Sequence, residues 1–169
     1  NQLENSNTDI LTPSPKITVD LNNPISMIAG LNQKTIHFSD LLATDSTPNN
    51  LPVAFIIKSL IDLKTLEDSL NILINRHESL RTSFELKENN LYFTVQPLNQ
   101  VKSKVDIFDI EEQSILSRIK ESSELRFDLS KAPILHSQLF NIKEGGHVLF
   151  LMFHHIVWDA TSFDIIKNE

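Results

Sequence analysis

The clearest hydrophobic pattern in the chain follows Asp62, a residue type that can cap the start of a helix. Apolar residues then recur at intervals of three or four up to His77, a spacing that lines one face of a helix. Similar but less regular spacing predicts three further helices. The four expected helices span residues 26–42, 63–77, 111–125 and 161–169.

Shorter segments rich in β-branched and aromatic residues, bounded by turn formers, predict strands. Val148–Phe153 is apolar at every position, as in a strand covered on both faces, so we expect it at the centre of a sheet. The pairs Asn89–Asn90 and Gly145–Gly146 favour tight turns and predict two hairpins. The mixed order of helices and strands predicts an α/β fold, an open sandwich. The expected strands span residues 51–60, 80–86, 91–96, 104–108, 134–142 and 147–153.

Composition narrows the class of protein. The 169 residues suit one domain, and residues 1–24, rich in Asn, Ser, Thr and Pro, are expected to be a linker. The net charge of −7 argues against binding to nucleic acid, and the absence of Cys excludes thiol chemistry and Cys-ligated metals. No apolar run reaches the roughly 18–20 residues of a transmembrane helix. The first residues do not resemble a signal peptide, so we expect a soluble, cytoplasmic segment from inside a longer polypeptide, without a membrane partner.

The first candidate site is the segment His154-His155-x-x-x-Asp159, where the most apolar strand ends. An imidazole held there could act as a base near neutral pH. A purely structural alternative stays open, in which both histidines are ordinary residues at the end of a strand and bond backbone carbonyls. The same three side chains could be considered as metal ligands, but the motif is not His-Glu-x-x-His and lacks the usual ligand support, so we expect no metal.

The second candidate segment runs from Arg76 to Phe84. Arg76 and His77 lie where a helix is expected to end and complement the negative end of its dipole. Arg81 is expected on the following strand, where a guanidinium can pair with a buried carboxylate through two hydrogen bonds. Asp159 stands beside apolar residues, so we expect it to be partly buried and paired with Arg81.

These two segments make the chain resemble a condensation domain of nonribosomal peptide synthetases, a member of the chloramphenicol acetyltransferase-like superfamily. The motif His-His-x-x-x-Asp-Gly resembles residues 154–160, and Arg-His-Glu-x-Leu-Arg-Thr-x-Phe is matched throughout residues 76–84. Weaker matches are Gln33–Phe38 and residues 127–135. The likeness covers residues 25–169 and implies the N-terminal lobe alone, an α+β sandwich with a mixed, mostly antiparallel sheet and helices packed on it. It implies that the C-terminal lobe is absent and that the isolated lobe is inactive.

The resemblance also implies a reaction and a set of roles. His155 would be the catalytic residue, assisting attack of a carrier-bound aminoacyl amine on a carrier-bound thioester. No cofactor would bind directly, since phosphopantetheine arms of donor and acceptor carrier proteins would present both substrates. Two alternatives stay open: an ester-forming acyltransferase, or a silent module that binds carriers. The supporting positions would be His154, Asp159, Ala160 (where the motif has Gly) and Arg81, with Arg76, His77 and Glu78 as a secondary motif.

Overall fold

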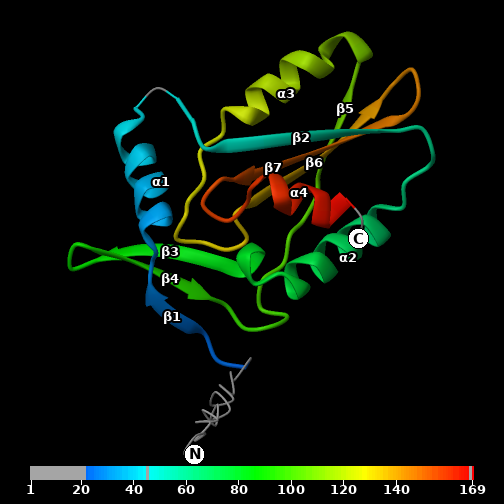
Figure 1. The fold of residues 1–169 in the computed structure, drawn as a ribbon. Coiled ribbons are helices and arrows are strands. Elements are labelled where there is room, and N and C mark those ends of the chain that lie inside the picture. The colour runs from blue at the N-terminus through cyan, green and yellow to red at the C-terminus, as the bar shows by residue number, and fades with distance from the viewer. Residues whose placement is uncertain (1–21, 45, 168) are drawn as a thin grey trace, which may run out of the picture.

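The computed structural model describes residues 22–44, 46–167 and 169, which form two sheets and the helices around them (Figure 1). The predicted linker over residues 1–24 therefore lies mostly outside the described residues. The elements are β1 (Ile25–Ile28), α1 (Leu31–Leu42), β2 (Asn50–Ile57), α2 (Leu63–Arg76), the 3₁₀ helix η1 (Glu78–Arg81), β3 (Thr82–Lys87), β4 (Asn90–Val95), β5 (Asp106–Ile110), the 3₁₀ helix η2 (Glu112–Ser114), α3 (Ile115–Ser123), β6 (Leu135–Ile142), β7 (His147–His154) and α4 (Ala160–Lys167).

The larger sheet has four strands in the order β2-β7-β6-β5. The pairs β2–β7 and β7–β6 are antiparallel, and β5 runs parallel to β6, so the predicted mixed and mostly antiparallel sheet is confirmed. The strand predicted at residues 147–153 lies inside this sheet, as its continuous apolar sequence indicated. Gly145 and Gly146 adopt positive φ in the turn between β6 and β7, which confirms the second hairpin.

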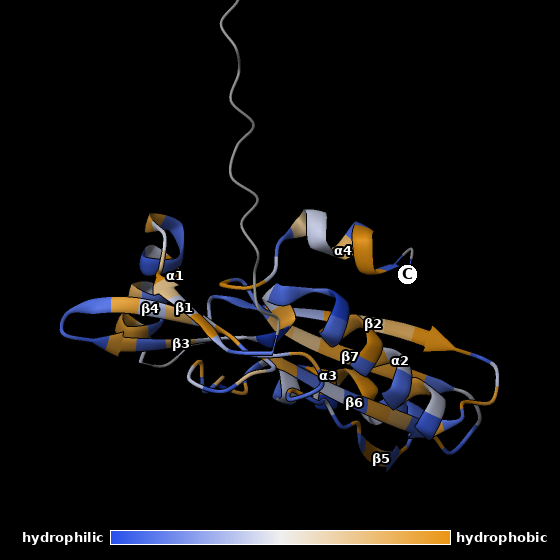
Figure 2. Cartoon of the chain, turned by 90° about the horizontal axis from the view of Figure 1, so that it is seen from below, coloured by the Kyte–Doolittle hydropathy of each residue, from blue (hydrophilic) through white to orange (hydrophobic). Residues whose placement is uncertain are grey.

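Alternation along β7 divides the core into two clusters on opposite faces of the sheet. Val148, Phe150 and Met152 pack with the side chains of α3, while Leu149, Leu151 and Phe153 pack with α2 and α4. Figure 1 shows α3 and α2 on opposite sides of the strands, and in Figure 2 α4 lies to one side of β2, β7 and β6. β7 is therefore a rigid central element whose successive residues face different surroundings.

The smaller sheet, in the order β1-β4-β3, is antiparallel throughout. Its β3–β4 hairpin was predicted, but the turn differs by one residue: Glu88 and Asn89 carry the positive φ angles, not Asn89 and Asn90. Asn90 instead pairs with Lys87 and closes the ladder. The two sheets share one core, because Phe84 and Leu91 belong to the same cluster as Leu149 and Leu151.

The helices were predicted with unequal success. α2 agrees closely, and Asp62 caps it by accepting a hydrogen bond from the Thr65 amide at 2.8 Å. The single helix predicted over residues 26–42 is wrong at its start, because the first residues form β1 against β4 and the backbone of Gly30 is extended before α1 begins. None of the helices among the described residues is long and apolar enough to cross a membrane.

Candidate functional site

The end of β7 presents two histidines to different surroundings. His154 is the last residue of the strand and is buried, whereas His155 follows it and is exposed. Side chains on a strand alternate between faces, so these neighbours leave the sheet in different directions. The backbone N–H of His155 donates to the carbonyl of Asn49 at 2.8 Å, which extends the pairing of β2 with β7 by one residue.

Both ring nitrogens of His154 are engaged. Its Nδ1 accepts from the Ile156 amide at 3.2 Å, and its Nε2 lies 2.5 Å from a carboxylate oxygen of Asp40 on α1. Since an amide can only donate, Nδ1 carries no proton and Nε2–H is the donor to Asp40. Burial lowers the pKa of His154 below its ordinary value, and the attraction of Asp40 opposes this without reversing it. His154 is therefore a neutral, fully bonded side chain with no nitrogen left for a substrate.

His155 has the complementary arrangement. Its Nδ1 lies 2.8 Å from the carbonyl oxygen of Trp158, and a carbonyl can only accept, so Nδ1 carries the proton. In the neutral ring the lone pair is then on Nε2, which bonds to no described residue. His155 also lines a pocket of about 330 Å³ together with Glu78, Thr82 and Phe84. One ring nitrogen of a pocket-lining histidine is thus left without a hydrogen-bond partner among the described residues.

The short loop after His155 is held by its neighbours and by the start of α4. Trp158 stacks on Phe153 with ring centroids 3.6 Å apart, which fixes the carbonyl that bonds His155. Asp159 caps α4 by accepting from the amide and hydroxyl of Ser162 at 2.8 and 2.7 Å. These Ser162 hydrogen bonds lower the pKa of Asp159. Ala160 is the first residue of α4, is exposed and does not have a positive φ.

The predicted ion pair between Arg81 and Asp159 is wrong. Arg81 ends η1 instead of lying on a strand, and its buried guanidinium donates to the carbonyl of Gln96 at 2.6 Å and to Glu78 at 3.2 Å. Asp159 was expected to be partly buried, but it is exposed. Because the Asp159 carboxylate is exposed to solvent and accepts two hydrogen bonds from Ser162, it needs no cation to remain charged.

The secondary motif divides between two places. Glu78 lines the pocket of His155. Arg76 and His77 instead bind Glu169 near the end of the chain, with N–O distances of 3.0 and 2.9 Å. The hydrogen bond from His77 is the main cause of the lowered pKa of Glu169. Arg76 and His77 therefore bind Glu169 instead of joining the site.

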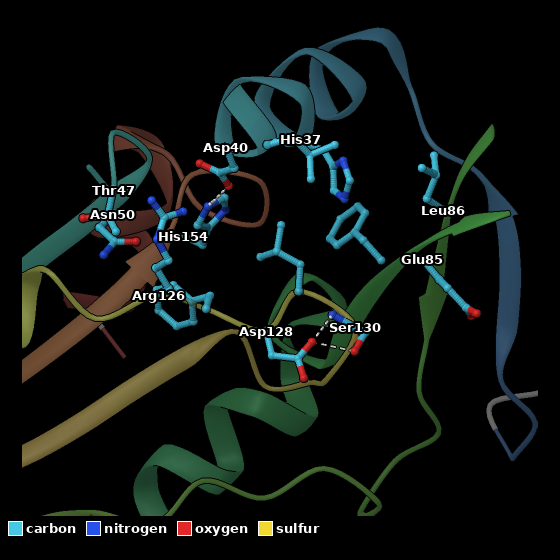
Figure 3. A pocket seen from close by; sticks show the side chains of 14 residues that line it. His37, Asp40, Thr47, Asn50, Glu85, Leu86, Arg126, Asp128, Ser130 and His154 are labelled. Carbon is cyan, nitrogen blue, oxygen red and sulfur yellow. Dashed lines mark hydrogen bonds and ion pairs between the residues drawn. The ribbon is translucent and has the colours of Figure 1, made fainter. Parts of the chain in front are cut away.

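Sequence reasoning missed Asp40 and Asn49. Asp40 lies in the last turn of α1 and faces a cavity of about 440 Å³ that Arg126, Asp128 and His154 also line (Figure 3). The side-chain amide of Asn49 donates to Asp40 at 2.6 Å. A carboxylate on a helix with exposed apolar neighbours looks like an ordinary surface residue, so only a packed structure could link it to His154.

The site has no group of three or more His, Asp or Glu side chains suited to hold a metal ion, and the rest of the described chain has none either. The exposed carboxylate of Asp159 is occupied by Ser162, and His154 is occupied by Asp40 and Ile156. The chemistry available here is proton acceptance or hydrogen bonding by the free nitrogen of His155.

Comparisons with known proteins show the family to which this chain is similar. A family model described as the condensation domain matches residues 27–169. The chain is 35% identical over 141 residues to surfactin synthase subunit 2 of Bacillus subtilis (strain 168), covering 81% of this chain and 4% of that protein. It is 31% identical over 170 residues to bacitracin synthase 2 of Bacillus licheniformis, covering 99% and 6%. The chain thus spans a small part of these relatives.

A solved structure supports the fold independently. The starter condensation domain of rhizomide synthetase superposes with a TM-score of 0.74 at 17% sequence identity. The match covers 85% of this chain and 35% of that chain. At this identity the likeness establishes the α+β architecture with helices packed on the sheet.

Proposed function

Since this chain belongs to the condensation-domain family, we propose that it is the N-terminal lobe of a condensation domain in a nonribosomal peptide synthetase and that His155 assists amide-bond formation. The observation that carries the proposal is the hydrogen bond from His155 Nδ1–H to the Trp158 carbonyl. It leaves the lone pair of the neutral ring on Nε2, beside a pocket. A base needs this arrangement in order to accept a proton.

The reaction we propose joins two tethered substrates. The amine nitrogen of an acceptor aminoacyl group attacks the carbonyl carbon of a donor thioester, a C–N bond forms and the C–S bond breaks. His155 Nε2 accepts a proton from the attacking amine and returns it to the departing sulfur. The phosphopantetheine arms of two carrier proteins would deliver the reactants, and their alignment would supply much of the acceleration.

The pocket beside His155 is only part of a complete site. It is about 330 Å³ and open, and its described lining comes from α1, η1, β3, β4, the loop after β7 and the start of α4. We propose that a second lobe of the same domain forms the remaining wall and excludes water from the thioester. The isolated lobe would then fold but not catalyse condensation, and the working synthetase would be cytoplasmic.

The test uses the complete domain with an acyl-loaded donor carrier and an aminoacyl-loaded acceptor carrier. His155→Ala is expected to reduce transfer by about 100-fold or more, because removing a positioned base costs on the order of 10²–10⁴. Intact-protein mass spectrometry of both carriers measures it. The matched control is His147→Ala, at the opposite end of β7, where the ring bonds Asn141 and lies away from the pocket.

Three results would contradict the proposal. Transfer at the wild-type rate by His155→Ala would remove the histidine from the mechanism. Failure of the wild-type domain to form an amide, with a hydroxyl acceptor acylated in the same assay, would replace amide formation by ester formation. Carrier binding without transfer to either acceptor would indicate a silent binding module.

A further inference from the structure

We propose that Asp40 and Asn49 are positioning residues that hold the end of β7 so that His155, which lines the pocket, keeps its Nδ1–H bonded to the Trp158 carbonyl. Neither residue touches the pocket of His155, so each would act through the strand end. This inference rests on the proposed function for its effect on rate. Its structural part concerns the rings of His154 and His155 and can be tested without catalysis.

The first connection runs through the ring of His154. Asp40 accepts the Nε2–H of that ring at 2.5 Å, while the Ile156 amide donates to Nδ1. The ring is thereby bonded at both ends, between α1 on one side and the turn after β7 on the other. Figure 3 shows the Asp40 carboxylate directed at the ring of His154 across the top of the cavity. The side chain of His154 is 4% exposed, so water cannot readily replace a lost partner.

The second connection runs through Asn49. Its side-chain amide donates to Asp40 at 2.6 Å and lies 2.7 Å from the Ser39 hydroxyl, so α1 fixes the residue before β2. The backbone carbonyl of that same residue accepts the N–H of His155 at 2.8 Å. One carboxylate therefore restrains His154 through its ring and His155 through its backbone.

These two connections meet at the loop that orients His155. The turn His154–Val157 is closed by a 3.0 Å hydrogen bond from the Val157 amide to the His154 carbonyl, and Trp158 supplies the acceptor for His155 Nδ1 one residue later. A shift of the strand end would move His155 relative to the Trp158 carbonyl and free the ring to exchange tautomers. Displacements of about 1 Å can cost about 100-fold in rate when reacting groups must be aligned.

The test compares four variants of Asp40 and its surroundings. Asp40→Ala removes the acceptor, whereas Asp40→Asn keeps one oxygen, which can still accept from His154, and Asn49 then retains the Ser39 hydroxyl as its acceptor. Asp128→Ala is the matched control, because Asp128 lines the same cavity and its carboxylate bonds Ser130 and Lys131, not His154. Asn49→Ala provides a second route to the same loop if Asp40→Ala does not fold.

The first measurement is the imidazole ¹⁵N spectrum of this chain, with the two rings assigned from His154→Gln and His155→Gln. In the wild type, His155 is expected as the fixed Nδ1–H tautomer and His154 as the Nε2–H tautomer. In Asp40→Ala the His155 nitrogens are expected to move toward the averaged shifts of two exchanging tautomers. Asp40→Asn and Asp128→Ala are expected to retain the wild-type pattern for His155.

The second measurement is acyl transfer by the complete domain. Asp40→Ala is expected to lower kcat by about 10- to 100-fold with KM for the carriers within about twofold, because alignment is lost and carrier contacts are not. Asn49→Ala is also expected to lower kcat and leave KM nearly unchanged, but with a smaller loss of kcat. Asp40→Asn should recover most of kcat.

The two measurements separate the possible failures. If Asp40→Ala and Asn49→Ala fold and leave the His155 spectrum and kcat unchanged, the positioning role is overturned. Loss of stability in both variants with unaltered His155 shifts would also overturn it, because it would reveal a merely structural role. If the wild-type domain transfers no acyl group, the proposed function fails, and the ¹⁵N spectra alone still decide the positioning role.

Discussion

The two sides of the β7 terminus differ in how completely their polar atoms are bonded. On the anchored side, formed by His154, Asp40 and Asn49, the His154 nitrogens and the Asp40 carboxylate have partners inside the protein. On the open side, formed by His155, Trp158 and Asp159, one imidazole nitrogen has no partner among the described residues, and the Asp159 carboxylate is exposed and accepts local hydrogen bonds from Ser162. Two adjacent histidines, His154 and His155, thus lie in opposite surroundings at the end of the same strand.

This difference shows how a fold can give a histidine a chemical role. A neutral ring bonded at both nitrogens is a structural element, because it has no free site and is costly to disturb. A ring bonded at Nδ1 alone has a defined tautomer and a free lone pair. The anchored side therefore supplies rigidity, and the open side supplies the nitrogen that this rigidity holds in place.

The largest expected effect is on stability, and it should separate the two sides. His154→Ala is expected to lower the free energy of unfolding by about 2–4 kcal/mol, because it removes buried packing and leaves the Ile156 amide without its partner. His155→Ala is expected to change it by less than about 0.5 kcal/mol, since that ring is exposed. Urea unfolding of this chain, followed by circular dichroism, measures both values.

Equal losses for the two variants would break the comparison between the sides. They would mean that His155 is packed as firmly as His154 and that its Nε2 is not available. Phe150→Ala serves as the reference for a fully buried site, since that ring is 0% exposed on the same strand.

A smaller effect is expected from pH. Burial lowers the folded-state pKa of His154, and also that of His136, where Asp106 partly opposes it. The unfolded chain then binds more protons than the folded one, so stability is complete above pH 6.5 and is lost as pH falls from 6.5 toward the folded pKa values. Each such histidine contributes a slope of at most about 1.4 kcal/mol per pH unit.

The measurement is the free energy of unfolding at several pH values between about 7.5 and 5, above the range in which carboxylates ordinarily titrate. His154→Gln is expected to reduce the slope, because glutamine does not titrate. His155→Gln is the matched control from the open side. A slope that His154→Gln leaves intact would show that folding does not lower the pKa of His154, contrary to its burial and its bonding to the Ile156 amide.

The sequence was sufficient to predict much of the fold. The helix at residues 63–77, the central strand and the glycine hairpin each depend on local periodicity or turn chemistry, and all three are confirmed. The strand before α1 was missed because β1 is only four residues long and pairs with β4, which is distant in sequence. Pairing across that distance is not visible in local spacing.

The site was predicted less completely, for the same reason. Local sequence placed His154, His155 and Asp159 at the end of a buried strand, which the structure confirms as their location. It paired Asp159 with Arg81 across 78 residues, whereas Asp159 uses Ser162 three residues away. Conversely, Asp40 and His154 are paired over a long separation that no spacing rule indicates. A helix cap between residues close in sequence can be predicted from the sequence. Which side chains pair across a long separation depends on how the chain packs.

The smallest expected effect concerns Ala160, where the family motif has glycine. In the structure Ala160 is exposed at the first turn of α4 and does not have the positive φ that would favour glycine. Ala160→Gly is therefore expected to lower the free energy of unfolding by less than about 1 kcal/mol, through loss of helix propensity, and to leave the His155 ¹⁵N spectrum unchanged. Thr161→Gly, in the same exposed turn, is the control and should behave alike. A gain in stability with Ala160→Gly alone would indicate strain at residue 160 and would extend the open side to the start of α4.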